Sequence, residues 1–112
     1  MTKNLSLHAE THLKVLRVLE STPNINQRKL AESLGVSLGK TNFCLKALLE
    51  KGMVKMENFR TSTRKLNYTY LLTPSGIAEK AALTQHFLKR KMEEYDALKA
   101  EIELLKQESS GN

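Results

Sequence analysis

The chain has 112 residues, a formal net charge of +6, 40% hydrophobic residues and one cysteine. That length allows one small domain with at most an appendage, and a lone cysteine excludes an internal disulfide. No segment approaches the ~20 apolar residues that span a bilayer, and the first residues, "MTKNLSLHAE", lack the apolar core of a signal peptide. We therefore predict a soluble, cytoplasmic protein without a membrane partner.

Charge is divided unevenly along the chain. Residues 1–73 contain 12 Lys and Arg against 5 Asp and Glu, a net charge of +7, whereas residues 74–112 contain 6 against 7, a net charge of −1. A basic first part beside a nearly neutral second part indicates that the first contacts a polyanion and that the second has another task.

The first predicted helix lies between Ser6, a candidate cap, and "STPN", where Pro23 cannot continue a helix. Its buried face is predicted from residues that recur at helical spacing, namely His12, Val15, Leu16 and Leu19.

A second helix is predicted in "INQRKLAESLG". Asn26 is a favourable N-cap, and Ile25 before it can pack on Leu30 in the first turn. Gly35 stands where the end of a helix requires a positive φ.

A third helix is predicted from its cap, Ser37, to about Lys51, with Gly52 ending it. Short helices separated at glycines in this way are typical of a helix-turn-helix. The Gly-Lys-Thr at its start also resembles the end of a phosphate-binding P-loop. That motif needs four residues between its glycines, whereas Gly35 and Gly39 leave three, and it follows a strand rather than an amphipathic helix. We therefore reject the NTPase interpretation.

The two sides of the third helix differ. One side is predicted to face the core through Val36, Thr41, Cys44, Leu45 and Leu48. The other presents Leu38, Gly39, Lys40, Asn42, Phe43 and Lys46. A DNA major groove suits this outward set, because apolar groups contact thymine methyls, Asn pairs with adenine and lysines bind phosphate or guanine. The alternative is that Leu38 and Phe43 pack on the hairpin or on a partner protein.

After Gly52 the pattern changes to the alternation of strands. Two strands of a hairpin are predicted from Val54 and Met56 and from Tyr68, Tyr70 and Leu72. Thr73 and Pro74 then mark the start of a helix that runs to about Gln107. We expect residues 1–73 to form one domain, residues 74–107 a C-terminal helix and residues 108–112 a disordered tail.

The last helix has a heptad pattern. Its predicted seam consists of Leu88, Lys91, Tyr95, Leu98, Ile102 and Leu105. Glu94 and Glu101 lie on one flank, and Lys99 and Lys106 on the other. In a parallel pair each Glu faces a Lys of the partner, whereas in an antiparallel pair like charges would meet. We predict a parallel homodimer, the alternative being that this stripe packs on its own domain.

Three stretches together carry a family resemblance: "INQRKLAESLGVSLGKTNFCLKALLEKGMV", the basic hairpin, and "YLLTPSGIAEK". They resemble the MarR family of winged-helix transcriptional regulators, especially its short subgroup associated with exopolysaccharide (EPS) gene clusters. The resemblance covers residues 11–107. It implies a dimeric DNA-binding protein whose third helix enters the major groove while the wing reaches the backbone or minor groove. By position in the motif, the implied DNA-binding residues are Ser37, Leu38, Gly39, Lys40, Asn42, Phe43, Lys46, Arg60, Arg64 and Lys65.

The sequence also departs from the family. Longer MarR proteins have additional terminal helices that interlock and line a ligand pocket, and here little precedes the first helix and one helix follows the wing. A small-molecule effector therefore stays unassigned. The wing tip, "RTSTR", has no acidic residue, which predicts less selective phosphate binding.

Other candidate sites have ordinary explanations. His8 and His12 are four residues apart, but no third ligand has suitable spacing, so we predict packing rather than a metal site. Cys44 on the core face is predicted to be a small buried hydrophobe rather than a redox sensor. No nucleophile–base or paired-carboxylate grouping stands out, so we predict no enzymatic activity and no cofactor.

The sequence thus predicts a mainly α protein with a small β wing, in which a winged helix-turn-helix domain precedes a long C-terminal dimerisation helix. The predicted function is that of a homodimeric regulator that binds pseudo-palindromic double-stranded DNA operators, with EPS genes as candidate targets. The alternative is a winged-helix protein–protein interaction module without specific DNA binding.

Overall fold

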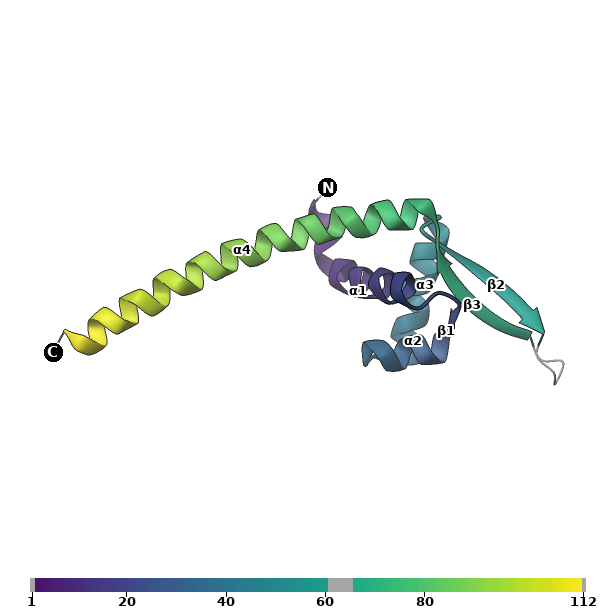
Figure 1. The fold of residues 1–112 in the computed structure, drawn as a ribbon, viewed down its shortest axis with the longest axis horizontal. Coiled ribbons are helices and arrows are strands. Elements are labelled where there is room, and N and C mark those ends of the chain that lie inside the picture. Colours follow the sequence, from purple (N-terminus) through teal and green to yellow (C-terminus); the bar gives the residue numbers. More distant parts are fainter. Residues whose placement is uncertain (1, 61–65, 112) are drawn as a thin grey trace. The chain divides into compact units, whose positions relative to one another are not determined.

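The computed structural model describes residues 2–60 and 66–111. Its elements in chain order are α1 (Thr2–Ser21), β1 (Ile25–Asn26), α2 (Gln27–Leu34), α3 (Leu38–Glu50), β2 (Val54–Arg60), β3 (Leu66–Leu72) and α4 (Pro74–Ser110) (Figure 1). The chain forms two compact units, Met1–Ala82 and Leu83–Asn112. The predicted fold class, mainly helical with a small β wing and a long C-terminal helix, is confirmed.

Helix α1 starts earlier than predicted. It begins at Thr2, so Ser6 lies inside the helix and does not cap it. The segment before Ser6 contains no Gly or Pro, and nothing in it stops the helix from extending. The end is as predicted, because α1 stops at Ser21, shortly before Pro23. Of the residues predicted for its inner face, Val15, Leu16 and Leu19 are buried and His12 is half-buried.

The helix-turn-helix forms from local capping interactions. The side chain of Asn26 accepts a hydrogen bond from the Lys29 N–H at 2.8 Å, and the Ser37 hydroxyl accepts one from the Lys40 N–H at 3.1 Å. Each cap satisfies a backbone donor that the first turn of a helix leaves free. Between the two helices, Gly35 has φ of 70° and its N–H bonds to the Ala31 carbonyl at 2.9 Å. These predicted starts and stops are confirmed.

The sheet has three antiparallel strands in the order β1-β3-β2. The two predicted strands pair in the hairpin, with Val54 opposite Leu72 and Met56 opposite Tyr70. Strand β1 was not predicted. Its Ile25 is opposite Tyr70, so this residue joins the sheet as well as preceding α2.

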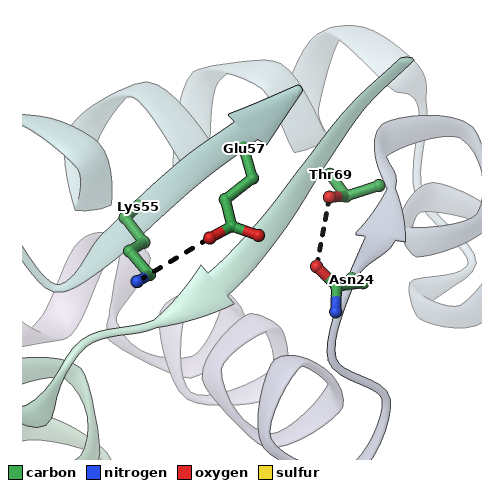
Figure 2. Close-up of polar contacts among 4 residues, drawn as sticks. All are labelled: Asn24, Lys55, Glu57 and Thr69. Atoms are coloured by element: carbon green, nitrogen blue, oxygen red, sulfur yellow. Dashed lines mark hydrogen bonds and ion pairs between the residues drawn. The ribbon is translucent and has the colours of Figure 1, made fainter. Parts of the chain in front are cut away.

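Beside β1, a polar contact joins the turn after α1 to the middle of β3 (Figure 2). The Thr69 hydroxyl donates to the side-chain oxygen of Asn24 at 3.3 Å, and the Asn24 N–H donates to the Tyr70 carbonyl at 3.3 Å. Asn24 has a positive φ of 64°, which asparagine tolerates better than most residues. The buried Thr69 is thereby satisfied inside the first unit.

Helix α4 starts at the predicted Thr73–Pro74 step. The Thr73 hydroxyl accepts a hydrogen bond from the Gly76 N–H at 3.1 Å. The helix continues through Ser110, three residues beyond the predicted end at Gln107. Residues 108–110 are therefore helical rather than part of a disordered tail, because "ESS" contains no helix breaker and the Ser110 hydroxyl bonds to the Lys106 carbonyl at 3.0 Å. No helix in the described parts of the chain is long and apolar enough to cross a membrane.

The core of the first unit is aliphatic and lies where α1 contacts α2, α3 and β3. Its most deeply buried side chains are Val15, Leu16, Leu19, Leu30, Thr41, Cys44, Leu45 and Leu48. The first turns of α4 also belong to this unit, where Lys80 pairs with Glu20 of α1 at 2.7 Å.

Gly76 is required by a close backbone approach. A Cβ at this position would collide with the carbonyl oxygen of Met53, which lies between α3 and β2. The obstructing atom belongs to the backbone, so a rotamer change cannot relieve the collision. Gly39 differs, because the nearest atom to an added Cβ there is the Ser37 hydroxyl oxygen at 4.0 Å.

We expect Gly76→Ala to lower the free energy of unfolding by about 1–3 kcal/mol, the usual range for overpacking. The matched variant Gly39→Ala should leave the stability unchanged or raise it by up to about 1 kcal/mol, because alanine favours a helix. Urea unfolding followed by circular dichroism measures both. Equal stability of the two variants would contradict the proposed collision.

Candidate nucleic-acid interface

Helix α3 divides into a buried side and an exposed side. Thr41, Cys44, Leu45 and Leu48 are buried, as predicted, and Val36 just before the helix is half-buried. The Thr41 hydroxyl donates to the Ser37 carbonyl at 2.9 Å, so this buried polar group is satisfied. All six residues predicted for the outer side are exposed, namely Leu38, Gly39, Lys40, Asn42, Phe43 and Lys46, and the Ser37 cap before them is exposed as well.

The exposed side of α3 combines apolar, amide and cationic groups. Leu38 is 44% exposed and Phe43 is 56% exposed, an unfavourable placement for large apolar side chains in water. No ion pair forms at Lys40 or Lys46 within the described residues. Gly39 adds no side chain, which leaves the backbone accessible to a ligand. The surface therefore offers uncompensated positive charge beside apolar groups.

The first turn of α2 lies next to the first turn of α3. The side-chain amide nitrogen of Gln27 donates to the Leu38 carbonyl at 3.3 Å, and this bond joins the N-terminal ends of α2 and α3. Arg28 and Lys29 follow Gln27 and are exposed. Helix N-termini and cations both favour an anion such as phosphate. Our sequence reasoning missed these two residues, although their place directly after the Asn26 cap was a usable signal.

The apolar residue Phe43 has one ring contact among the described residues. Its ring meets the ring of His8 on α1 in an edge-to-face arrangement, with centroids 5.2 Å apart. His8 also stacks on His12 at 6.2 Å. More than half of the surface of Phe43 therefore stays available to a ligand.

The His12 ring lies at the edge of the core. Its Nε2 atom is buried and has no hydrogen-bond partner among the described residues. Burial lowers the pKa of His12 below its ordinary value, and the positive charges of Lys51 and of protonated His8 lower it further. His12 therefore favours its neutral form in the folded protein. Within the described residues no group of three or more His, Cys, Asp or Glu side chains is placed to bind a metal ion.

Cys44 belongs to the packing of the domain. It is buried on the inner side of α3 and is not in a disulfide. Burial raises the pKa of its thiol, an effect that the charge of Lys40 partly opposes. A thiol held protonated in this way is a poor nucleophile, in agreement with the predicted role as a small buried hydrophobe.

The wing is formed by β2 and β3. Arg60 is the last residue of β2, and the predicted contact residues Arg64 and Lys65 lie outside the described residues. On β2, the exposed Lys55 pairs with Glu57 at 3.8 Å (Figure 2). This surface pair reduces the positive charge at the base of the wing.

The second unit consists of the remainder of α4, and its predicted seam is solvent-exposed. Five apolar side chains of the seam have exposed fractions between 44% and 62%, namely Leu88, Tyr95, Leu98, Ile102 and Leu105. Lys91 is also exposed and pairs with Glu94 of the same helix at 3.4 Å. The seam is continuous along the helix because its members recur at heptad spacing.

Comparison with known proteins identifies the fold. The family described as winged helix-turn-helix DNA-binding matches residues 9–55, from α1 to the start of β2. No curated protein sequence matches the chain. One similar solved structure is a transcriptional regulator from Thermoplasma acidophilum, with 20% identity over 83% of this chain and 94% of that chain and a TM-score of 0.72.

Two further solved structures resemble the chain at a similar level. A MarR family transcription regulator has 17% identity, covering 88% of this chain and 70% of its own, with a TM-score of 0.60. A mutant of MepR from S. aureus, bound to an oligodeoxyribonucleotide, has 23% identity, covering 90% and 78%, with a TM-score of 0.59. The chain thus has a winged helix-turn-helix fold, and its structural neighbours include a MarR-family regulator, as the sequence resemblance predicted.

The lowered pKa of His12 makes the stability of the domain depend on pH. His12 binds a proton more readily in the unfolded chain than in the folded chain. The free energy of unfolding should therefore be highest above the ordinary pKa of 6.5 and should fall as the pH drops below it. Urea unfolding at several values between about pH 7.5 and 5.5 should show this decline. His12→Leu should flatten it, and an unchanged slope in that variant would contradict the assignment.

Proposed function

We propose that the chain is a sequence-specific DNA-binding transcriptional regulator that acts as a homodimer on pseudo-palindromic operators. The observation that carries this proposal is the exposed side of α3, where apolar side chains, an amide and two lysines stand together on one helix, with no ion pair to these lysines from the part of the chain that the structure describes. The proposed role of this surface is binding rather than catalysis. A regulator of this kind works in the cytoplasm, on the DNA itself.

The exposed side of α3 fits the chemistry of a major groove. Asn42 has the two hydrogen-bonding groups that pair with adenine, and Phe43 and Leu38 suit the methyl groups of thymine. At Gly39 the missing side chain allows the helix backbone to approach the base edges. These groups would supply direct readout of sequence.

Phosphate contacts would come from both sides of this helix. The first turn of α2 presents Arg28 and Lys29, and its Gln27 is bonded to the first turn of α3. On the wing, Arg60, Arg64 and Lys65 would contact the backbone or the minor groove. Such contacts fix position on the duplex and carry most of the salt dependence of binding.

Dimerisation would bury the exposed seam of α4. Five large apolar side chains along one stripe are unfavourable in water, and a second copy of the same stripe covers them by knobs-into-holes packing. Lys91 at one core position lowers stability but helps to set the register. Isolated helices with so short a seam are marginal, so the dimer would also depend on contacts outside it.

Charge on the flanks favours a parallel dimer. Glu101 of one chain would face Lys106 of the partner subunit, and Glu94 would face Lys99 of the partner subunit. In the single chain Glu94 pairs with Lys91 and, at 4.0 Å, with Arg90. These pairs are exposed and weak, so they can exchange for pairs between the chains. A two-fold axis then relates two recognition helices, and the half-sites would lie about one helical turn apart.

A second candidate function is a protein-binding module. The exposure of Leu38 and Phe43 favours it, because apolar surface of this kind also suits a protein partner. DNA is the stronger proposal because Arg28, Lys29, Lys40 and Lys46 lie around this surface. The sequence resemblance to the EPS-associated subgroup makes promoters of exopolysaccharide genes the first targets to test, beside DNA selected from a random pool.

We expect two substitutions to separate the kinds of DNA contact. Asn42→Ala should lower discrimination against mismatched operators by about 1–3 kcal/mol. Arg64→Ala should weaken binding to all duplexes alike and reduce the salt slope by about one. Fluorescence anisotropy at several salt concentrations measures both. If neither change affects any duplex, the protein-binding function replaces the DNA-binding function.

We expect a charge reversal in α4 to weaken the dimer reversibly. Glu101→Lys should raise the dimer dissociation constant roughly tenfold, because two like-charged pairs replace two favourable ones. The double variant Glu101→Lys/Lys106→Glu should restore it. Sedimentation equilibrium provides the measurement. Tighter association of the single variant would indicate an antiparallel pair instead.

A further inference from the structure

Three rings form a column from the edge of the core to the exposed side of α3. The rings of His12 and His8 stack with centroids 6.2 Å apart and an interplanar angle of 25°. The His8 ring then meets the Phe43 ring at 5.2 Å and 62°. His12 and His8 are half-buried, and Phe43 is 56% exposed. We call this set the ring column.

The ring column gives an exposed side chain a defined neighbour. An exposed phenylalanine without a neighbour samples several rotamers, and a ligand that contacts it must immobilise it. An edge-to-face contact favours one orientation of the ring. His8 is itself supported by His12, four residues further along the same face of α1. The orientation of Phe43 is therefore coupled to α1, an element outside the two helices of the helix-turn-helix.

We propose that His8 is a positioning residue for DNA recognition, which holds the Phe43 ring ready to contact an apolar group on the base edges of the major groove. The inference rests on the proposed function and deepens it. His8 affects the choice of sequence through Phe43 and needs no contact of its own with the DNA. General phosphate affinity comes from the lysines and arginines and does not depend on the ring column.

The experiment compares a specific duplex, selected from random DNA, with an unrelated duplex of the same length. The ratio of the two dissociation constants measures specificity. His8→Ala and His8→Gln, which both remove the ring, should lower this ratio about twofold to tenfold, the usual value of an aromatic pair. His8→Phe should restore the ratio because it returns a ring to the same place.

A double-mutant cycle tests the coupling to Phe43. Phe43→Ala should lower the ratio, and adding His8→Ala to it should cause no further loss. His86→Ala is the matched control, because His86 also meets a phenylalanine edge-to-face, Phe87 at 5.1 Å, but lies in the second unit. This control should leave the ratio unchanged. Thermal unfolding of each variant shows whether it is folded.

The outcomes distinguish the inference from the function on which it rests. If the unmodified protein binds no duplex, both are overturned. If Phe43→Ala lowers the ratio but the His8 variants do not, or if the two losses add, the inference fails and the DNA-binding function stands. An equal loss of affinity for both duplexes in the His8 variants would show a structural role and would likewise overturn it.

Discussion

The positions of α3, the wing and the start of α4 depend on one backbone junction. The Met53 N–H donates to the Leu48 carbonyl of α3 at 3.0 Å, and the Met53 carbonyl accepts the Thr73 N–H at 3.1 Å. The Thr73 hydroxyl donates to the Gly52 carbonyl at 2.6 Å, and Gly76 packs closely on Met53. Because the ends of α3, β3 and α4 meet here, the wing keeps a defined relation to the exposed side of α3.

The chain has two exposed apolar surfaces, and they are the reason why we propose DNA binding for the first unit and dimerisation for the second. On α3 the apolar groups lie among cations. This combination suits a ligand that carries negative charge together with an ordered series of polar and apolar groups. On the second unit the apolar groups form a heptad stripe between Glu and Lys flanks, which suits a second copy of the same helix. The same cause, apolar surface left in water, thus points to different partners because the neighbouring charges differ.

Much of the fold and of the candidate site was predictable because its signals are local. The caps at Asn26 and Ser37, the positive φ of Gly35 and the Thr73–Pro74 helix start each depend on residues within about four positions. The exposed side of α3 followed from its helical period in the same way. The place of Arg28 and Lys29 in the first turn of α2 could be read from the Asn26 cap, but the Gln27 bond that brings this turn beside α3 belongs to the tertiary structure, and the two residues were therefore missed.

The sequence by itself determined the helices, those of their ends that a cap, a glycine or a proline marks, the two strands of the hairpin and the heptad stripe, since periodicity and capping act over short stretches of chain. The tertiary structure alone decided that Ile25 pairs with Tyr70 in a third strand, and that His8 meets the ring of Phe43. It also placed the first turns of α4 in the same unit as the winged helix-turn-helix. These contacts join residues far apart in the chain, and only the packing of the core brings such residues together.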